Sequence, residues 1–453
     1  MATSEGNFQR TARGYLALID KYNGKTNAIL TRLEELAMEQ AARADEAEQR
    51  GEWLGLLHGV CITLKDCLHV AGYRTTYGSE LYAEQISRSD SAVTARLRQA
   101  GAIFLGKSNL TEFCYGATGE NPAYGDINNP WSLGRVPGGS SSGAAAAAAT
   151  DVCRLAIGSD TGGSVRIPAA LCGVVGLRPT FGRVSNANAL GLTVDFDTIG
   201  PLARSVSDVA RAFAAIAGHD PGDPVSIAAP VENFLPTLHD GIAGVRIGLP
   251  KSYFFEQVQP EIERAVLAAA TTLERAGARL IDMVVPSAEQ AQTNIHICMA
   301  RADMADMHRD EMERRPDAIG PEVLRRLRLG LDVSGRDYAA ARRWLSLWRR
   351  DLREMFKEVD LLLTPTTPIV APLRKASADM VETTQALARF TVGIGCAGLP
   401  ALTLPCGFGE AGMPVGVQLV AKWLDEALLF RAGCAFQART EFHLVRPPLV
   451  TNG

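Results

Sequence analysis

Residues 134–182 read GRVPGGSSSGAAAAAATDVCRLAIGSDTGGSVRIPAALCGVVGLRPTFG, and the fold can be worked out from this stretch. Two turns rich in glycine and serine, 138–143 and 158–164, flank six alanines and a short apolar run. Ala144 to Ala149 favour a helix because alanine loses no side-chain entropy there. The run Leu155 to Ile157 is apolar and bounded by glycine, which predicts a buried strand. We therefore expect the order turn, helix, strand, turn.

Both turns are suited to chemistry. Glycines let successive backbone N–H groups point into one concavity, which favours a negatively charged oxygen. A serine in such a turn can be a nucleophile, but its hydroxyl is weak unless a base lies nearby. The rest of the chain must therefore supply that base.

The composition is that of a large globular protein. The 453 residues are 47% hydrophobic and 21% charged, which is enough for a sizeable core in one large domain or two. The net charge of −4 and the lack of a basic tract argue against nucleic acid and membrane partners. The polar N-terminus has no signal-peptide core, and the nine cysteines include no CxxC pair. We expect a cytoplasmic protein with reduced thiols and with no metal or cofactor.

Helical spacing in residues 8–50 predicts two helices, and the apolar run 56–64 predicts a strand that ends at Lys65. Residues 260–355 are expected to be mostly helical. Other strands are expected at 102–105, 245–249, 359–365, 391–408 and 414–421, and other helices at 91–100 and 205–217. Because the last strands return from far along the chain, we expect an α/β fold. It would have one large mixed β-sheet flanked by helices, with the helical middle as an insertion.

Two motif matches point to other functions. Gly101 to Ser108 fits the spacing of a phosphate-binding loop, but the residues between its glycines favour a buried strand over a flexible loop. The segment 139–143 fits a nucleophile elbow with Ser141 as nucleophile, but no strand precedes it. Histidines that could complete such a site follow, but none stands in a distinctive setting: His219, His239, His296, His308 and His443.

A third combination uses no histidine. Lys65 closes an apolar strand, where a charge is unusual, although it could also be a lysine that extends to solvent beside Asp66. The combination is Lys65, Ser140 and Ser164. The sequence segments around these three residues resemble the amidase signature family of serine hydrolases. The similar motifs are 64–66, 138–141 and 158–185, with weaker agreement over nearly the whole chain. Ser142 and Ala144 depart from the family pattern, which usually has glycine, then serine or glycine, at these places.

The resemblance implies a catalytic triad. Ser164 would attack the amide carbonyl, and Ser140, on a cis peptide, would pass the proton to Lys65. The backbone N–H groups of Thr161, Gly162, Gly163 and Ser164 would form the oxyanion hole. Asp160, Arg166 and Ser141 would support this loop. A carboxylate beside Lys65 would keep its amine charged, so we expect Asp66 to turn away from it.

The resemblance also implies one amidase signature domain over residues 1–453. It would comprise N-terminal helices (1–55), a catalytic core (56–218), a mostly helical insertion (250–355) and the C-terminal part of the sheet (356–453). A homodimer is implied by the family. Residues 112–125, 190–197 and the insertion would line the substrate pocket, with Cys114, Tyr115 and Thr118 as candidates.

The expected substrate is a small linear amide, an aryl amide, or a carbamate or urea derivative, cleaved through an acyl-enzyme. The absence of a basic tract favours a free-standing hydrolase. The alternatives are an amidotransferase A-type subunit that needs partners, a 1-carboxybiuret-like hydrolase, and an inactive scaffold subunit.

Overall fold

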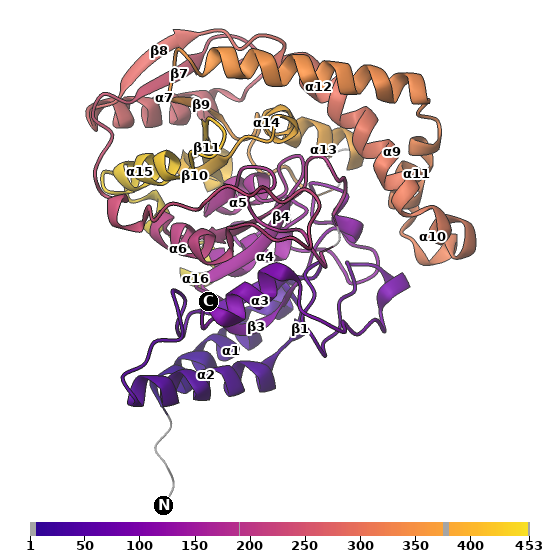
Figure 1. Ribbon diagram of the computed structural model, residues 1–453, viewed down its shortest axis with the longest axis vertical. Helices are drawn as coiled ribbons and strands as arrows, with labels where there is room; N and C mark the ends of the chain where they lie inside the picture. Colours follow the sequence, from indigo (N-terminus) through magenta and orange to yellow (C-terminus); the bar gives the residue numbers. More distant parts are fainter. Residues whose placement is uncertain (1–5, 190, 375–379, 452–453) are drawn as a thin grey trace, which may run out of the picture.

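The computed structural model describes residues 6–189, 191–374 and 380–451. Within them one mixed sheet has the strand order β1-β3-β2-β4-β6-β5-β10-β11-β9-β7-β8 (Figure 1). The expected large mixed sheet flanked by helices is therefore confirmed. The strands are β1 (Ile29–Arg32), β2 (Cys61–Lys65), β3 (Ile103–Ser108), β4 (Leu155–Asp160), β5 (Val175–Arg178), β6 (Thr198–Ala203), β7 (Arg246–Pro250), β8 (Arg279–Met283), β9 (Leu361–Pro365), β10 (Ala401–Phe408) and β11 (Pro414–Ala421).

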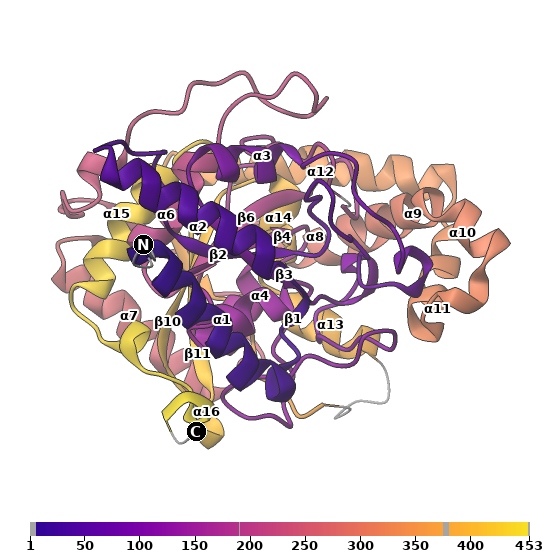
Figure 2. The same cartoon turned by 90° about the horizontal axis from the view of Figure 1, so that it is seen from below.

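Helices cover the sheet and extend beyond it. Figure 2 shows α1 and α2 running side by side at the N-terminal end, whereas α9 to α11 project from the opposite side of the molecule. The helices are α1 (Asn7–Thr26), α2 (Glu34–Gln49), α3 (Ala92–Gln99), α4 (Ser142–Ala149), α5 (Arg166–Cys172), α6 (Val206–Ile216), α7 (Pro260–Arg275), α8 (Ala288–Ala291), α9 (Ile297–Met307), α10 (Arg309–Arg314), α11 (Pro321–Leu331), α12 (Gly335–Met355), α13 (Met380–Ala388), α14 (Val392–Ala397), α15 (Glu426–Gln437) and α16 (Pro448–Thr451). None of the described helices is long and apolar enough to cross a membrane.

Strand direction determines where the polar groups meet. β2 pairs in parallel with both β3 and β4, so the carboxyl ends of these three strands lie at one edge of the sheet. Lys65 ends β2, and Asp160 ends β4. This edge therefore gathers charged residues that are distant in sequence, as is usual for binding sites in such sheets.

The alanine-rich helix α4 packs against the strands β4, β6, β2 and β3. All of its residues are buried, because the small side chains allow the helix to approach the strands closely. Gly143 is required here, since a Cβ atom at this position would lie 2.3 Å from the carbonyl oxygen of Ala28. The expected order of turn, helix and strand is confirmed for this segment.

Several local expectations were wrong. A short strand, β1, separates the two N-terminal helices, and the strand expected from residue 56 begins only at Cys61. The stretch 260–355 is mostly helical, but it also contains the unexpected strand β8, whose short, half-exposed pattern resembles a helix face. The run expected as a strand at 391–408 begins as α14, because Gly398 adopts a left-handed conformation that ends a helix before β10.

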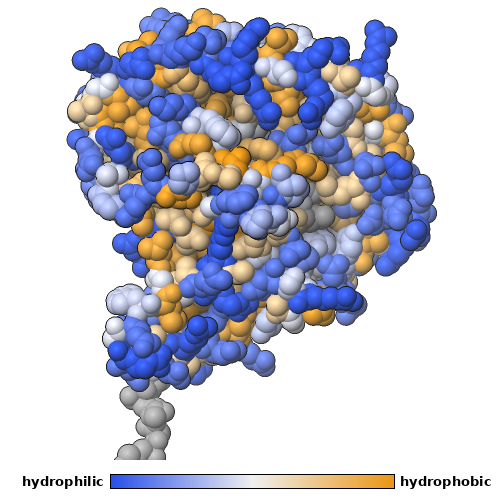
Figure 3. Space-filling model, in the orientation of Figure 1, coloured by the Kyte–Doolittle hydropathy of each residue, from blue (hydrophilic) through white to orange (hydrophobic). Residues whose placement is uncertain are grey.

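The molecular surface is mixed in polarity. In the view of Figure 3 hydrophilic side chains dominate the rim of the molecule, and apolar side chains gather near the centre. Helix α12 is amphipathic. It buries Leu345, Trp348 and Leu352 on one face and exposes charged residues on the other. Helix α12 packs against α8, α9 and α14.

Candidate active site

Lys65 lies at the end of β2 with no exposed surface. Its Nζ atom donates to the hydroxyl oxygen of Ser140 at 2.7 Å and to that of Ser159 at 2.8 Å. The structure thus brings together Lys65 and Ser140, two of the residues of the predicted triad. Ser159 was not among the predicted site residues, although a polar residue near the end of a buried strand was a signal that could have identified it.

Asp66 turns away from this amine, as expected. Its carboxylate forms a buried ion pair with Lys107 at 2.7 Å, and it accepts hydrogen bonds from the backbone and the hydroxyl of Thr76. Lys107 belongs to β3, so residues 103–108 of that motif form a strand and not a phosphate-binding loop. Lys107, the lysine of the phosphate-loop match, pairs with the Asp66 carboxylate. The Lys65 amine, by contrast, donates to Ser140 and Ser159.

The two glycine-serine turns lie against each other. The peptide bond between Gly139 and Ser140 is cis, and the backbone N–H of Ser141 donates to the carbonyl of Ser164 at 3.1 Å. The Ser141 hydroxyl is buried and bound to the backbone of Ser159. It is therefore not free to act as an elbow nucleophile. Ser164 is 9% exposed to solvent. Its hydroxyl has no hydrogen-bond partner in the described part of the chain.

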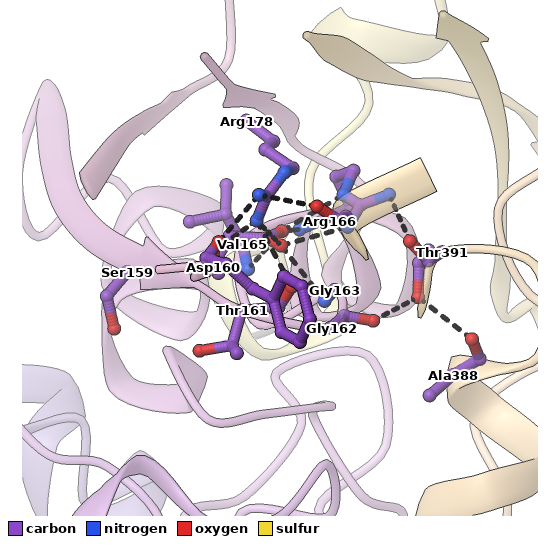
Figure 4. A network of polar contacts seen from close by, with 12 residues as sticks. Ser159, Asp160, Thr161, Gly162, Gly163, Val165, Arg166, Arg178, Ala388 and Thr391 are labelled. Atoms are coloured by element: carbon purple, nitrogen blue, oxygen red, sulfur yellow. Dashed lines mark hydrogen bonds and ion pairs between the residues drawn. The ribbon is translucent and has the colours of Figure 1, made fainter. Parts of the chain in front are cut away.

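Asp160 lies beside the turn formed by Thr161, Gly162 and Gly163 and organises it through hydrogen bonds and ion pairs (Figure 4). Its carboxylate accepts from the backbone N–H groups of Gly163 and Val165 at 2.9 and 3.1 Å. It also pairs with Arg166 at 2.9 Å and with Arg178 at 3.1 Å. Burial would raise the pKa of Asp160, but the two guanidinium groups outweigh it and hold the pKa well below its usual range. Asp160 thus contacts Arg166, which was among the predicted supporting residues, and also Arg178, which was not.

The turn presents backbone donors. The N–H groups of Thr161, Gly162 and Ser164 have no acceptor in the described residues, whereas the N–H of Gly163 is already engaged with Asp160. Three of the four predicted oxyanion donors are therefore free in this conformation. Thr391 fixes the turn by donating to the carbonyl of Gly162 at 2.6 Å. Gly163 has φ +134°, and a Cβ atom there would lie 2.2 Å from the Thr391 hydroxyl, so glycine is needed.

Comparison with known proteins agrees with this arrangement. A family model described as Amidase matches residues 10–430. The chain belongs to the amidase family. Like its structural neighbours in that family, it is an amidase, an enzyme that acts on the carbon–nitrogen bonds of amides.

Individual relatives cover almost the whole amidase chain. The A-type subunit of the glutamyl-tRNA(Gln) amidotransferase of Moorella thermoacetica is 41% identical, over 95% of this chain and 93% of that protein. One solved structure comes from a vestigial protein complex that reveals the evolutionary origins of an s-triazine catabolic enzyme. It is 35% identical to this chain, with a TM-score of 0.90 over 95% of both chains. The 6-aminohexanoate cyclic dimer hydrolase with bound substrate is 27% identical, with a TM-score of 0.87 over 99% of this chain and 96% of that one.

The three predicted pocket residues of the amidase lie in different surroundings in the structure. Cys114 lies beside the site, with its sulfur 3.9 Å from the Ser159 hydroxyl, and Tyr115 lines a small cavity next to it. The Thr118 hydroxyl instead donates to Glu120, and Thr118 does not line this cavity. A larger surface groove of about 630 Å³ lies between α12 and Trp423, and none of the predicted site residues lines it.

Of the predicted segment 190–197, residue 190 lies outside the described residues, and the rest reaches the site through Asp197. The Thr161 hydroxyl donates to the Asp197 carboxylate, which also accepts from the backbone of Thr193 at 3.0 Å. Burial raises the pKa of Asp197 to about 6. This loop therefore supports the amidase site from the side of β6.

Proposed function

We propose that the chain cleaves amides through an acyl-enzyme formed on Ser164. The observation that carries this proposal is the buried contact of 2.7 Å between Lys65 Nζ and Ser140 Oγ, beside the Ser164 turn. Ser164 Oγ would attack the carbonyl carbon while its proton passes through Ser140 to the Lys65 amine. Lys65 would then protonate the leaving nitrogen, and water would hydrolyse the ester to release the acid.

The sequence alone favoured a free-standing hydrolase, but the relatives support the amidotransferase alternative better. The A-type subunit of an amidotransferase matches at 41% identity over nearly the full length of both chains. In this role the chain would release ammonia from a donor amide for use by partner subunits. The free-standing hydrolase is our second candidate, and its support comes from the resemblance to 6-aminohexanoate cyclic dimer hydrolase.

The nucleophile can be tested directly. We expect a fluorophosphonate to modify Ser164, as mapped by mass spectrometry, and Ser164→Ala to abolish ammonia release from primary amides. Ser140→Ala and Lys65→Ala should each weaken turnover severely, because each breaks the proton path. Label on Ser141, or wild-type turnover by Lys65→Ala, would contradict the assignment.

An experiment can distinguish the amidotransferase subunit from the free-standing hydrolase. The purified chain should be mixed with the other subunits of the Moorella thermoacetica amidotransferase, and the amidation of glutamyl-tRNA(Gln) should be measured. Amidation that requires this chain and fails with Ser164→Ala would support the subunit role. Rapid turnover of small amides by the chain alone, without amidation in the mixture, would favour the free-standing hydrolase.

A further inference from the structure

The groove of about 630 Å³ between α12 and Trp423 is separate from the proposed catalytic residues. Its lining comes mainly from the end of α12, from the end of α14 and from the turn after β11. Lys65, Ser140, Ser159 and Ser164 do not line it. Pockets that hold small molecules usually measure about 300–1,000 Å³, so the groove is large enough for a small ligand. A ligand bound there would not contact the groups that cleave the amide.

Apolar side chains form much of the lining. Leu352 and Leu399 are buried against the protein, whereas the indole of Trp423 is 51% exposed. Phe181 and Phe356 add two further aromatic rings, both of them half-buried. Removing such surface from water is favourable roughly in proportion to the area covered. The groove therefore favours a ligand with an apolar body.

The charged residues of the groove are all cations. Arg349 and Arg353 lie one helical turn apart on α12, Lys357 follows just after its end, and Lys422 precedes Trp423. None of the described residues that line the groove is acidic. Each lysine has a carboxylate partner on the surface, at 2.6 Å for Lys357 and 3.5 Å for Lys422. The two lysines are therefore already partly neutralised.

The two arginines have no such partner. Neither Arg349 nor Arg353 forms an ion pair in the described part of the chain. Arg349 is half-buried and donates to the backbone carbonyl of Cys396 at 3.2 Å, which leaves its other N–H donors unused. Burial lowers the pKa of Arg349, because a covered cation without an anion is costly. An anion beside these two residues would offset that cost.

We propose that this groove binds an amphipathic monocarboxylate of the fatty-acid type, with its carboxylate at Arg349 and Arg353 and its alkyl chain along the aromatic residues. A guanidinium binds a carboxylate through two parallel hydrogen bonds, which suits a single anionic group. A polyphosphate fits less well, because two of the four cations are already paired and much of the lining is apolar. The hollow shape favours a free acid over a lipid surface, since it can enclose the chain as well as the head group. This site is independent of the proposed amide hydrolysis.

The test measures the binding of octanoate to the full chain by calorimetry. We expect a Kd below about 1 mM and binding about tenfold tighter than that of octan-1-ol, which has the same chain length without the charge. Hexanoate should bind roughly tenfold more weakly than octanoate, because each buried methylene contributes about fourfold. Equal binding of octanoate and octan-1-ol, or no dependence on chain length, would overturn the proposal.

Variants locate the bound acid. Arg349→Gln should reduce the preference for octanoate over octan-1-ol about tenfold, and Arg353→Gln about threefold, because Arg353 is exposed and its charge is screened. Arg343→Gln changes an exposed arginine of the same helix that does not line the groove, so it should preserve the preference. Trp423→Ala should weaken both ligands. Octanoate binding that is insensitive to both groove arginines would overturn the site, and if Arg349→Gln does not fold, Arg353→Gln decides.

Two further measurements address other occupants of the groove. Binding of the chain to phosphatidylglycerol vesicles without binding of octanoate would overturn the free acid in favour of a lipid surface. A dimer in light scattering that Trp423→Ala dissociates, again without octanoate binding, would assign the groove to a second copy of the chain. Amide turnover without octanoate binding would overturn the groove site alone, and octanoate binding without amide turnover would overturn the proposed hydrolysis alone.

Discussion

At the scale of single residues, Ser159 shares the Lys65 amine with Ser140. The Ser159 hydroxyl lies 2.8 Å from Nζ, and it positions the amine without belonging to the proposed proton path. We expect Ser159→Ala to lower kcat about ten- to hundredfold with little change in KM, because a hydrogen bond to a charged or reacting amine is lost. Steady-state kinetics on a primary amide would measure the effect, with the exposed Ser346→Ala as control. An unchanged kcat would mean that Ser140 alone positions Lys65.

A second prediction for single residues concerns the buried ion pair between Asp66 and Lys107. Both side chains are fully buried, so removing the cation leaves an uncompensated carboxylate. Lys107→Met should lower the free energy of unfolding by about 3–5 kcal/mol, as measured by urea denaturation. The double variant Asp66→Asn/Lys107→Met should be less destabilised, because it removes both charges. Equal losses in the two variants would contradict this electrostatic explanation.

At the scale of elements, the loop before β6 should make stability depend on pH. Burial raises the pKa of Asp197 to about 6, so the folded state binds this proton more tightly than the unfolded chain, whose carboxyl titrates near ~3.9. The stabilisation is complete below about pH 4 and is lost as the pH rises through about 6.

Asp197→Asn should therefore reduce the decline in unfolding free energy between about pH 4 and about pH 7. The reduction should be about 3 kcal/mol at most, and urea titrations at several pH values would measure it. Part of the decline should remain, because burial also raises the pKa of Asp303 to about 6. The same pH dependence in wild type and variant would refute the role of Asp197.

Helix packing supplies a matched pair of glycine substitutions. Gly143→Ala would place a methyl group 2.3 Å from the Ala28 carbonyl, so we expect a loss of about 2–3 kcal/mol in unfolding free energy. Gly14→Ala in α1 meets no atom within 4 Å and should gain about 1 kcal/mol from helix propensity. Thermal or urea unfolding would reveal opposite signs, and a neutral Gly143→Ala would show that α4 can shift.

At the scale of the whole molecule, Glu112 joins two segments that lie far apart in the sequence, those of Ser79 and Gly320. Its buried carboxylate accepts from the Ser79 hydroxyl at 2.6 Å and from the backbone of Gly320, at the start of α11, at 2.9 Å. We expect Glu112→Ala to lower the unfolding free energy by about 2–4 kcal/mol, because two buried donors lose their acceptor. Glu112→Gln, which retains one acceptor oxygen, should lose less, and equal effects of the two would refute this link.

The sequence predicted what depends on local pattern. The glycine-serine turns, α4 and the strand that ends at Lys65 all follow from residue type and spacing. The large mixed sheet followed from the strands at both ends of the chain. β8 and α14 did not follow, because short apolar segments fit either a strand or a helix until their neighbours are known.

The sequence by itself therefore determined the family, the turns and the candidate residues Lys65, Ser140 and Ser164. Only the tertiary structure decided which partners these residues have. It assigned Lys107 to Asp66, placed Ser159 beside Lys65, and brought Arg178 to Asp160. The physical reason is that burial and charge pairing join residues far apart along the chain, and no local periodicity encodes such contacts.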